Sequence, residues 1–221
     1  MTLIEYPDRD IMMMDLASTL AGELNAALMA NDQASLAVPG GTTPAPMFDS
    51  LCAADLDWSR VTVMASDERQ VPESSERSNA RLIRRHLLQG RAAAAQFLSF
   101  AVDPQDSLDP QIQALADHLP LSVLVLGMGA DMHTASLFPG SPELAAALDP
   151  DAAPLMRLQA PGAPEPRLSL SAPVLRGALS VHIVITGSEK RAALTRAEEL
   201  NDPLTAPICV VLQDATVHWA E

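Results

Sequence analysis

One segment near the middle of the chain constrains the fold more than any other. Residues 121–126 (Leu-Ser-Val-Leu-Val-Leu) form a nearly uninterrupted apolar run of strand length. Such a run is typical of a β-strand buried on both faces, as in a parallel sheet covered by helices. Two glycines, Gly127 and Gly129, follow it, and then come Asp131 and His133. Because open α/β sheets bind ligands at the carboxyl ends of their strands, we expect a functional site in this loop. A turn whose histidine merely satisfies a neighbouring group is the simpler alternative.

The rest of the chain alternates between strand-like and helix-like hydrophobic patterns. This alternation predicts an α/β fold with a doubly wound, mostly parallel sheet and helices on both faces. The length of 221 residues and the lack of an internal repeat predict a single domain over residues 1–221. The proline-rich stretch 150–166 is expected to be a loop or a flap. The expected strands are residues 35–38, 61–66, 97–100, 121–126, 181–186, 207–212 and 216–219, and the expected helices are residues 9–30, 45–54, 78–89, 111–118 and 188–200.

The charge of the chain limits its partners. With 28 acidic and 14 basic residues the formal net charge is −14, which argues against nucleic acid or an anionic membrane as a partner. No apolar stretch approaches the length of a membrane span. Cys52 and Cys209 lie far apart without a metal-binding or redox spacing, and the first residues lack the pattern of a signal peptide. We therefore expect a protein of the reducing cytoplasm, and the sequence leaves its oligomeric state open.

A loop with two glycines follows the strand predicted at residues 35–38. Gly40 and Gly41 permit a tight turn with exposed amides, Thr42 or Thr43 can cap the following helix, and Pro44 suits its first turn. Free amides at the start of a helix form an anion site. The spacing matches neither a Walker loop nor the GxGxxG fingerprint. An ordinary strand–helix turn is the alternative reading.

Charged residues also follow the strand predicted at residues 61–66. Asp67, Glu68 and Arg69 come directly after it, and an arginine there can hold a phosphate or carboxylate with two parallel hydrogen bonds. A solvated charge cluster is the alternative. Arg167 opens a later, alternating segment, where it either binds such an anion or acts as an edge charge that discourages aggregation.

Lys190 is the only lysine among the 14 basic residues. Ser188 is a plausible N-cap, which would place Lys190 in the first turn of a helix. A cation there opposes the helix dipole, whereas a bound anion would make the same position favourable. We therefore interpret Lys190 as a binding residue, with a plain surface position as the alternative.

Taken together, these motifs resemble the 6-phosphogluconolactonase family in their order and approximate spacing. The string from Asp131 to Pro139 is specific to that resemblance, whereas the Gly-Gly-Thr loop is shared more widely. The resemblance runs from about residue 36 to residue 192. The matching segments are residues 39–44, 67–72 with 78–79, 127–140, 167–175 and 187–190.

The resemblance implies hydrolysis of 6-phospho-D-glucono-1,5-lactone to 6-phosphogluconate, the second step of the oxidative pentose phosphate pathway, with no metal and no organic cofactor. It also implies the fold shared by glucosamine-6-phosphate deaminase and ribose-5-phosphate isomerase. His133 would be the general base that activates water, and Asp131 would orient the loop or the imidazole. The residues implied to bind the phosphate or the sugar hydroxyls are Gly40, Gly41, Thr42, Asp67, Arg69, Asn79, Arg167 and Lys190.

The sequence departs from the family at Met132, where the family usually has glycine. Glycine adopts a positive φ freely, but a residue with a Cβ does so at a cost of about 1–2 kcal/mol. We therefore predict a φ below zero at Met132. We also predict that His133 points toward the pocket formed by residues 40–42 and Lys190.

Two other functions remain open from the residues. A deaminase or isomerase of amino-sugar phosphates on the same fold carries an acid soon after the histidine. Here residues 134–139 contain no acid, and Glu143 comes later. A non-catalytic sugar-phosphate sensor usually carries a helix-turn-helix, for which this acidic chain has neither the length nor the charge. The three functions differ in what they release. A deaminase releases ammonia, a lactonase releases acid from a lactone, and a sensor releases neither.

Overall fold

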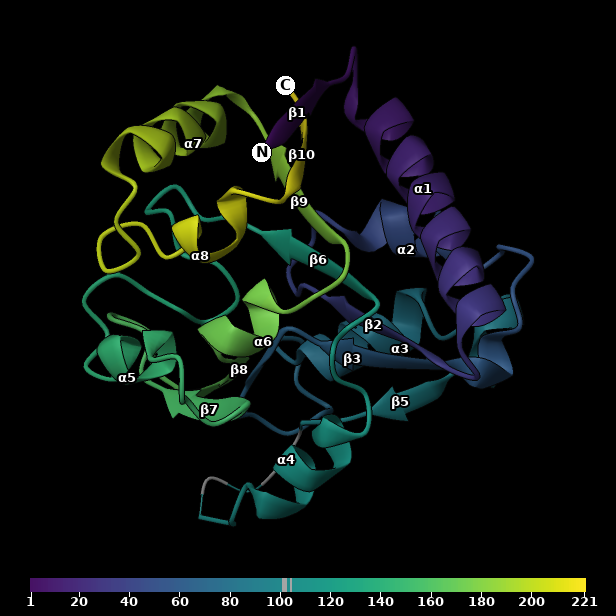
Figure 1. Cartoon of the computed structure of the whole chain (residues 1–221), viewed down its shortest axis with the longest axis horizontal. Coiled ribbons are helices and arrows are strands. Elements are labelled where there is room, and N and C mark those ends of the chain that lie inside the picture. Colours follow the sequence, from purple (N-terminus) through teal and green to yellow (C-terminus); the bar gives the residue numbers. More distant parts are fainter. Residues whose placement is uncertain (101–102, 104) are drawn as a thin grey trace.

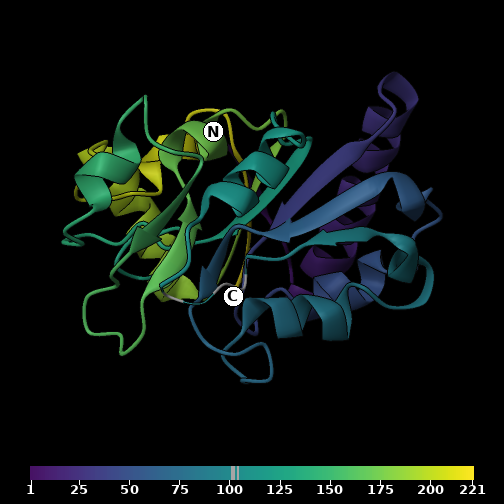
Figure 2. The same cartoon turned by 90° about the horizontal axis from the view of Figure 1, so that it is seen from below.

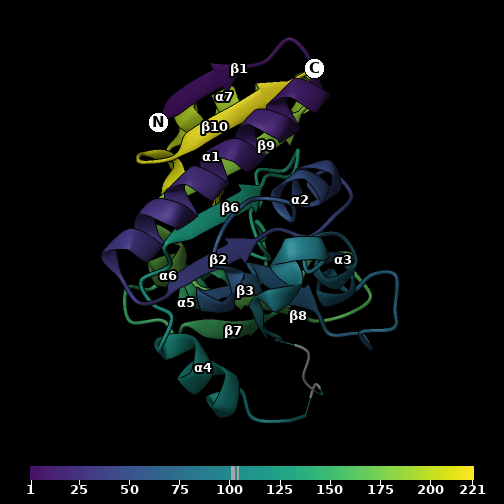
Figure 3. The same ribbon diagram turned by 90° about the vertical axis from the view of Figure 1, so that its right-hand side faces the viewer.

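The computed structural model describes residues 1–100, 103 and 105–221. Within these residues, the central sheet has seven strands, and every neighbouring pair is parallel. Figure 3 shows the strands stacked in order, with the long first helix lying across them. From edge to edge the strands are β1 (Thr2–Glu5), β10 (Thr216–Ala220), β9 (Val181–Thr186), β6 (Val123–Gly127), β2 (Ala34–Val38), β3 (Val61–Ala65) and β5 (Gln96–Leu98).

The central strand β6 explains why the sequence needs a continuous apolar run. Successive side chains of a strand point to opposite faces of the sheet. Val123 and Val125 pack into the core on one face, and Leu124 and Leu126 pack into the core on the other. Because both faces are covered, every one of these positions is apolar. The predicted doubly wound parallel sheet is confirmed.

Helices cover both faces of the sheet. Figures 1 and 2 show α1 on one side of the strands and the C-terminal helices on the other. The first face carries α1 (Arg9–Ala30), α2 (Ala45–Leu51) and α3 (Asn79–His86) with the short 3₁₀ helices η1 (Trp58–Arg60) and η2 (Gly90–Ala94). The second face carries α4 (Asp109–Ala116), α5 (Leu144–Leu148), α6 (Ala172–Arg176), α7 (Ser188–Leu200) and α8 (Cys209–Leu212). Among the described residues, no helix is long and apolar enough to cross a membrane.

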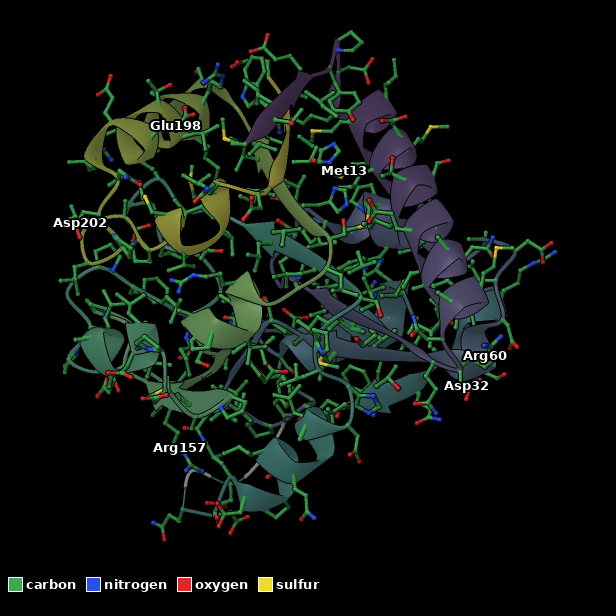
Figure 4. All side chains as sticks on the ribbon, viewed as in Figure 1. Met13, Asp32, Arg60, Arg157, Glu198 and Asp202 are labelled. Carbon is green, nitrogen blue, oxygen red and sulfur yellow. The ribbon has the colours of Figure 1, made fainter. Side chains whose placement is uncertain are left out.

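Both ends of α1 have polar partners for their free backbone groups. The carboxylate of Asp8 accepts a hydrogen bond from the amide of Ile11 at 2.8 Å and so caps the first turn. At the other end, the guanidinium of Arg60 donates to the carbonyl of Leu28 in the last turn at 3.0 Å and to that of Asp32 just beyond the helix at 2.7 Å. Figure 4 shows Arg60 and Asp32 together beneath the helix. These contacts satisfy carbonyls that the helix itself leaves free.

The order of the strands creates a crevice. The chain adds β3 and β5 on one side of β2, and later adds β6, β9 and β10 on its other side. The connections therefore leave β2 and β6 in opposite directions, at the point where α/β sheets bind their ligands. The loops at the carboxyl ends of β2 and β6 border this crevice.

A second sheet lies on the same face as the C-terminal helices. It has three antiparallel strands, β4 (Asp67–Arg69), β8 (Arg167–Leu170) and β7 (Leu155–Leu158), in that order. The prediction for residues 150–166 is thus corrected, because this stretch contains β7. The prolines flank the strand instead of interrupting it, so the composition of the stretch hides it.

Two further corrections concern the ends of the chain. The segment predicted as a strand at residues 207–212 contains helix α8 instead. Its turn is closed by the amide of Val210, which donates to the carbonyl of Pro207 at 3.1 Å. Periodicity does not decide the state of so short an apolar run. The edge strand β1 was not expected, and it pairs in parallel with β10.

Candidate active site

A pocket lies at the carboxyl ends of the central strands and gathers most of the predicted site residues. Thr42 is not one of them, because it lies exposed outside the pocket and its neighbour Thr43 lines the wall instead. Asp131 is not part of the wall either but stands behind His133. The predicted residues that line the pocket are Gly40, Gly41, Asp67, Arg69, Asn79, His133, Arg167 and Lys190. The other lining residues are Pro39, Thr43, Pro44, Ser66, Gly127, Met128, Gly129, Ala135, Phe138 and Val184.

The loop after β2 presents unpaired main-chain donors to the pocket. Among the described residues, none accepts a hydrogen bond from the amides of Gly40, Gly41 or Thr42. Gly41 has a φ of 84°, a conformation that favours glycine. The predicted threonine cap is wrong: Pro44 is the N-cap of α2, and no side chain caps the helix. The loop nevertheless offers the free donors that bind an anion.

Asn79 forms the floor beneath this loop. Its side chain is buried, and a Cβ at position 40 would overlap it, so the close approach requires Gly40 to be glycine. Nδ2 of Asn79 donates to the main-chain carbonyl of Asp67 at 2.7 Å. One buried amide thus joins the loop after β2 to the end of β3.

Glu68 was given no role by the sequence, yet it organises this part of the pocket. Its buried carboxylate accepts from the amides of Asn79 at 2.8 Å, Ala80 at 2.7 Å and Arg69 at 2.8 Å. Burial raises the pKa of Glu68, while these amides favour the charged form and oppose that rise. The available signal was its place between Asp67 and Arg69 at the end of a strand.

Ser136 is a second residue that the sequence did not single out. Its hydroxyl donates to Oδ2 of Asp67 at 2.6 Å, and both side chains are buried. The loop after β6 is therefore tied to the start of β4.

Two arginines face each other where β4 pairs with β8. Arg69 and Arg167 are directly opposite in the antiparallel register, and both line the pocket. Nη1 of Arg69 donates to the carbonyl of Arg77 at 2.6 Å, and Nη2 of Arg167 lies 3.7 Å from Oε1 of Glu165. The Nε atoms of both arginines are buried without a partner among the described residues.

This pairing of like charges favours the binding of an anion, although Asp67 and Glu165 already offset part of the charge at Arg167. Burial, and after it the nearby charge of Arg69, lowers the pKa of Arg167 from its ordinary value. A bound phosphate or carboxylate would pair with both cations and remove their mutual repulsion. The edge-charge alternative for Arg167 is disfavoured, because the residue is only 8% exposed.

Lys190 lies in the first turn of α7 and lines the pocket. Gly187, not Ser188, is the N-cap of this helix, so the predicted cap is corrected by one residue. Burial lowers the pKa of Lys190, and the neighbouring Glu189 opposes that shift. Among the described residues, no carboxylate forms an ion pair with its ammonium group. Its environment, like that of the arginines, becomes favourable when an anion binds.

His133 and Asp131 form a close pair at the pocket wall. Nδ1 of His133 lies 2.5 Å from Oδ1 of Asp131, and Oδ1 also accepts from the His133 amide at 3.3 Å. Among the described residues, Nε2 of His133 has no hydrogen-bond partner. An aspartate that accepts from Nδ1 selects the tautomer whose Nε2 can take a proton. His133 lines the same pocket as Gly40, Gly41 and Lys190, as predicted.

The prediction for Met132 is wrong, because its φ is 68°. Its amide donates to the carbonyl of Gly129 at 3.0 Å, and its carbonyl accepts from the amide of Ile208 at 3.1 Å. The side chain is buried in the core on the second face. Burying such a side chain stabilises the fold by about 1.5–3 kcal/mol, which outweighs a left-handed backbone cost of about 1–2 kcal/mol. The core thus holds Met132 in a conformation that glycine would adopt freely.

Known proteins share the sequence pattern and the fold of this chain. Residues 7–219 match the family described as glucosamine-6-phosphate isomerases/6-phosphogluconolactonase. A 6-phosphogluconolactonase of Pseudomonas aeruginosa is 44% identical over 212 residues, which are 92% of this chain and 88% of that protein.

Solved structures show the same fold. The crystal structure of a 6-phosphogluconolactonase from Shewanella baltica OS155 superposes with a TM-score of 0.95 at 33% identity and covers 100% of this chain and 97% of that one. A monomeric glucosamine-6-phosphate deaminase superposes with a TM-score of 0.79 at 16% identity, over 100% of this chain and 98% of its own. The second likeness concerns the fold alone, and it confirms the expected kinship with the deaminase fold.

Proposed function

This chain belongs to the family of glucosamine-6-phosphate isomerases and 6-phosphogluconolactonases, and we propose that it hydrolyses 6-phospho-D-glucono-1,5-lactone to 6-phosphogluconate. The observation that carries the proposal is that His133, paired with Asp131 behind it, lines a pocket with three cations. Arg69, Arg167 and Lys190 suit the phosphate of the substrate, and His133 suits the activation of water. We further propose that residues 1–221 act as one sugar-phosphate-binding domain in the cytoplasm.

His133 begins the reaction. Its free Nε2 takes a proton from water while the water oxygen attacks the carbonyl carbon of the lactone. The electron pair of the carbonyl bond moves to its oxygen, which becomes an oxyanion. Asp131, at Nδ1, holds the imidazole in the required tautomer and stabilises the imidazolium that forms. A lactone is an activated ester, so no covalent nucleophile is needed.

Collapse of the oxyanion completes the reaction. The carbonyl bond re-forms, the bond to the ring oxygen breaks, and His133 returns its proton to that oxygen. The products are a hydroxyl group and a carboxylic acid, which releases its proton to solvent. Because water is the only co-reactant that this balance requires, we propose that the reaction uses neither a metal nor an organic cofactor.

The remaining residues bind the substrate. Donors to the phosphate and the sugar hydroxyls come from the free amides of Gly40, Gly41 and Thr42. The side chains of Arg69 and Lys190 supply charged donors, and Arg167 completes the cationic wall. Asp67 and Asn79 line the same pocket. Thr42 does not line the pocket, so any contribution from it comes from its unpaired amide at the edge of the loop.

The deaminase alternative lacks its acid. Glu143 does not line the pocket, and its carboxylate accepts from the hydroxyl of Ser141 and the amide of Gln159, both at 3.0 Å. Among the described lining residues the only carboxylate is that of Asp67, whose Oδ2 accepts from Ser136. Glu143 is therefore not available for ring opening, and the Asp67 carboxylate is engaged by Ser136.

Freshly prepared phosphogluconolactone tests the proposal directly. Proton release should exceed the spontaneous hydrolysis measured without protein, and His133→Ala should lower kcat by about 10²–10⁴-fold with a smaller effect on KM. Glucosamine 6-phosphate is the parallel substrate, and we expect no ammonia from it. Ammonia release without lactone hydrolysis would instead establish the deaminase, and near-normal turnover by folded His133→Ala would remove His133 from the mechanism.

A further inference from the structure

Phe138 contacts both kinds of functional group in the pocket. Its ring centroid lies 4.1 Å from that of the His133 imidazole, with 26° between the two planes. The guanidinium carbon of Arg167 lies 5.8 Å from the centroid of the same Phe138 ring. One aromatic ring therefore touches the proposed base and one of the proposed substrate-binding cations.

The backbone that carries Phe138 is tied down at several points. The hydroxyl of Thr134 donates to the carbonyl of Gly127 at 2.9 Å, and the amide of Leu137 donates to the carbonyl of Thr134 at 2.9 Å. Ser136 donates to Asp67, and the side chain of Leu137 is fully buried. Contacts of the neighbouring residues therefore fix the backbone at position 138, so a substitution of the ring should leave this backbone in place.

Packing in the core does not explain this ring. Among the described residues, Phe138 belongs to neither of the two hydrophobic clusters and to neither group of residues packed against them. It is one of four phenylalanines in the chain, and it lines the same pocket as His133 and Arg167. A role in core packing alone would not require the ring to lie at the pocket wall.

The contact supplies what Asp131 lacks. The hydrogen bond at Nδ1 restrains one edge of the imidazole, whereas a ring stacked on its face also limits rotation about the Cβ–Cγ bond of His133. When His133 takes a proton from water, the face of the aromatic ring also attracts the imidazolium. The His133 imidazole and the Arg167 guanidinium are then held in a fixed geometry relative to each other. Such a fixed geometry is what an oriented attack on the substrate requires.

We propose that Phe138 is a positioning residue, which fixes the plane of the His133 imidazole and aligns it with the Arg167 guanidinium for the reaction. The inference rests on the proposed role of His133 as the base. Phe138 itself exchanges no proton and makes no polar contact with the substrate.

The test compares Phe138→Leu with Phe138→Tyr, which keeps the ring. Phe138→Leu should lower kcat about tenfold, equivalent to about 1.4 kcal/mol, and change KM by less than about threefold. Phe138→Tyr should keep most of the wild-type kcat. Phe97→Leu is the matched control, because Phe97 lies under Arg84 at 4.6 Å and outside the pocket. It should leave kcat unchanged.

Proton NMR supplies a readout that does not depend on activity. The ring protons of His133 should be shifted upfield by the stacked ring in wild type and Phe138→Tyr, and should lose that shift in Phe138→Leu. Loss of the NMR shift with an unchanged kcat would overturn the positioning role, as would equal loss of kcat in the leucine and tyrosine variants. If wild type itself fails to hydrolyse the lactone, the proposed function fails first, and the NMR comparison still reports whether Phe138 holds the imidazole.

Discussion

Gly129 lies against His133 so closely that no other residue fits beneath the imidazole. A Cβ at position 129 would overlap Nδ1 of His133 and also Oδ1 of Asp131. The amide of Gly129 in turn donates to the carbonyl of His133 at 3.0 Å. The second glycine of the loop therefore makes room for the histidine–aspartate pair.

We expect Gly129→Ala to lower kcat for the lactone by at least tenfold. The new methyl group must displace the imidazole or the carboxylate, and a misplaced base loses part of its 10²–10⁴-fold contribution. Gly22→Ala is the control, because a Cβ at that helical position meets nothing within 4 Å. The control should keep full activity and gain about 0.5–1 kcal/mol of stability. Equal activity of Gly129→Ala and wild type would contradict the crowding described here.

Arg69→Ala and Lys190→Ala should chiefly weaken binding of the phosphorylated substrate. Each removes a charge-assisted hydrogen bond worth about 1.5–3 kcal/mol, which corresponds to a rise in KM of roughly 10- to 150-fold. The measurement compares phosphorylated with unphosphorylated gluconolactone in steady-state kinetics. Arg191→Ala is the control, since Arg191 pairs with Glu5 at 3.5 Å and does not line the pocket. Equal losses on both lactones would show that the two cations do not bind the phosphate.

Substitutions of Met132 should separate backbone strain from core packing. Met132→Ala removes buried contacts and keeps the positive φ, so we expect a loss of about 2–5 kcal/mol. Met132→Gly removes the same contacts but relieves the left-handed strain, so it should be about 1 kcal/mol more stable than the alanine variant. Urea unfolding of the three proteins checks the order. An alanine variant as stable as the glycine variant would show that the φ of Met132 carries no strain.

A chain of hydrogen bonds under α1, with His182 and His218 buried at its centre, gives a pH-dependent prediction. Tyr6 Oη lies 2.9 Å from Nδ1 of His218 and donates to Asp15 at 2.7 Å. Nε2 of His218 lies 3.0 Å from Nδ1 of His182, whose Nε2 lies 2.9 Å from Oε2 of Glu23. Burial, and after it the charge of His182, lowers the pKa of His218 from 6.5 to about 4, although Asp15 and Glu23 oppose the shift.

Stability should therefore fall as the pH drops from about 6.5 toward 4. In this window the unfolded chain protonates position 218 and the folded chain does not, so protons favour unfolding. The full loss is on the order of 3 kcal/mol, and it is absent above pH 6.5. The pKa of Glu23 is also lowered: burial raises it, but the hydrogen bond to His182 and its charge outweigh that effect. The stability that the ionised Glu23 carboxylate contributes is likewise lost as the pH falls.

The variant His218→Gln should flatten this acid-side loss. The urea midpoint is measured at several pH values between 4 and 7.5, and the slope with pH is compared, so that a uniform loss of stability does not affect the result. His118→Gln is the control, since that residue lies outside the hydrogen-bond chain. An unchanged slope in His218→Gln would show that His218 does not link folding to protons.

Much of the fold could be predicted from the sequence because its signals are local. The uninterrupted apolar run at residues 121–126 indicated a strand buried on both faces, and β6 has that environment. The long helix α1 was predicted with its observed bounds from apolar residues at helical spacing. Short segments such as α8 and β7 were not predicted, because four residues carry too little periodicity to decide between helix and strand.

Some features of the site could likewise be predicted from the sequence, and others were decided only by the tertiary structure. Residue type and spacing were enough to single out His133, Arg69 and Lys190, since each is a chemically distinctive group at the expected end of a strand or start of a helix. Only the tertiary structure placed Arg69 opposite Arg167, and only it gave Met132 a positive φ. Both outcomes depend on contacts between segments far apart in the chain. Spacing along the sequence carries no record of such contacts, because they arise when the sheets and the core close around the pocket.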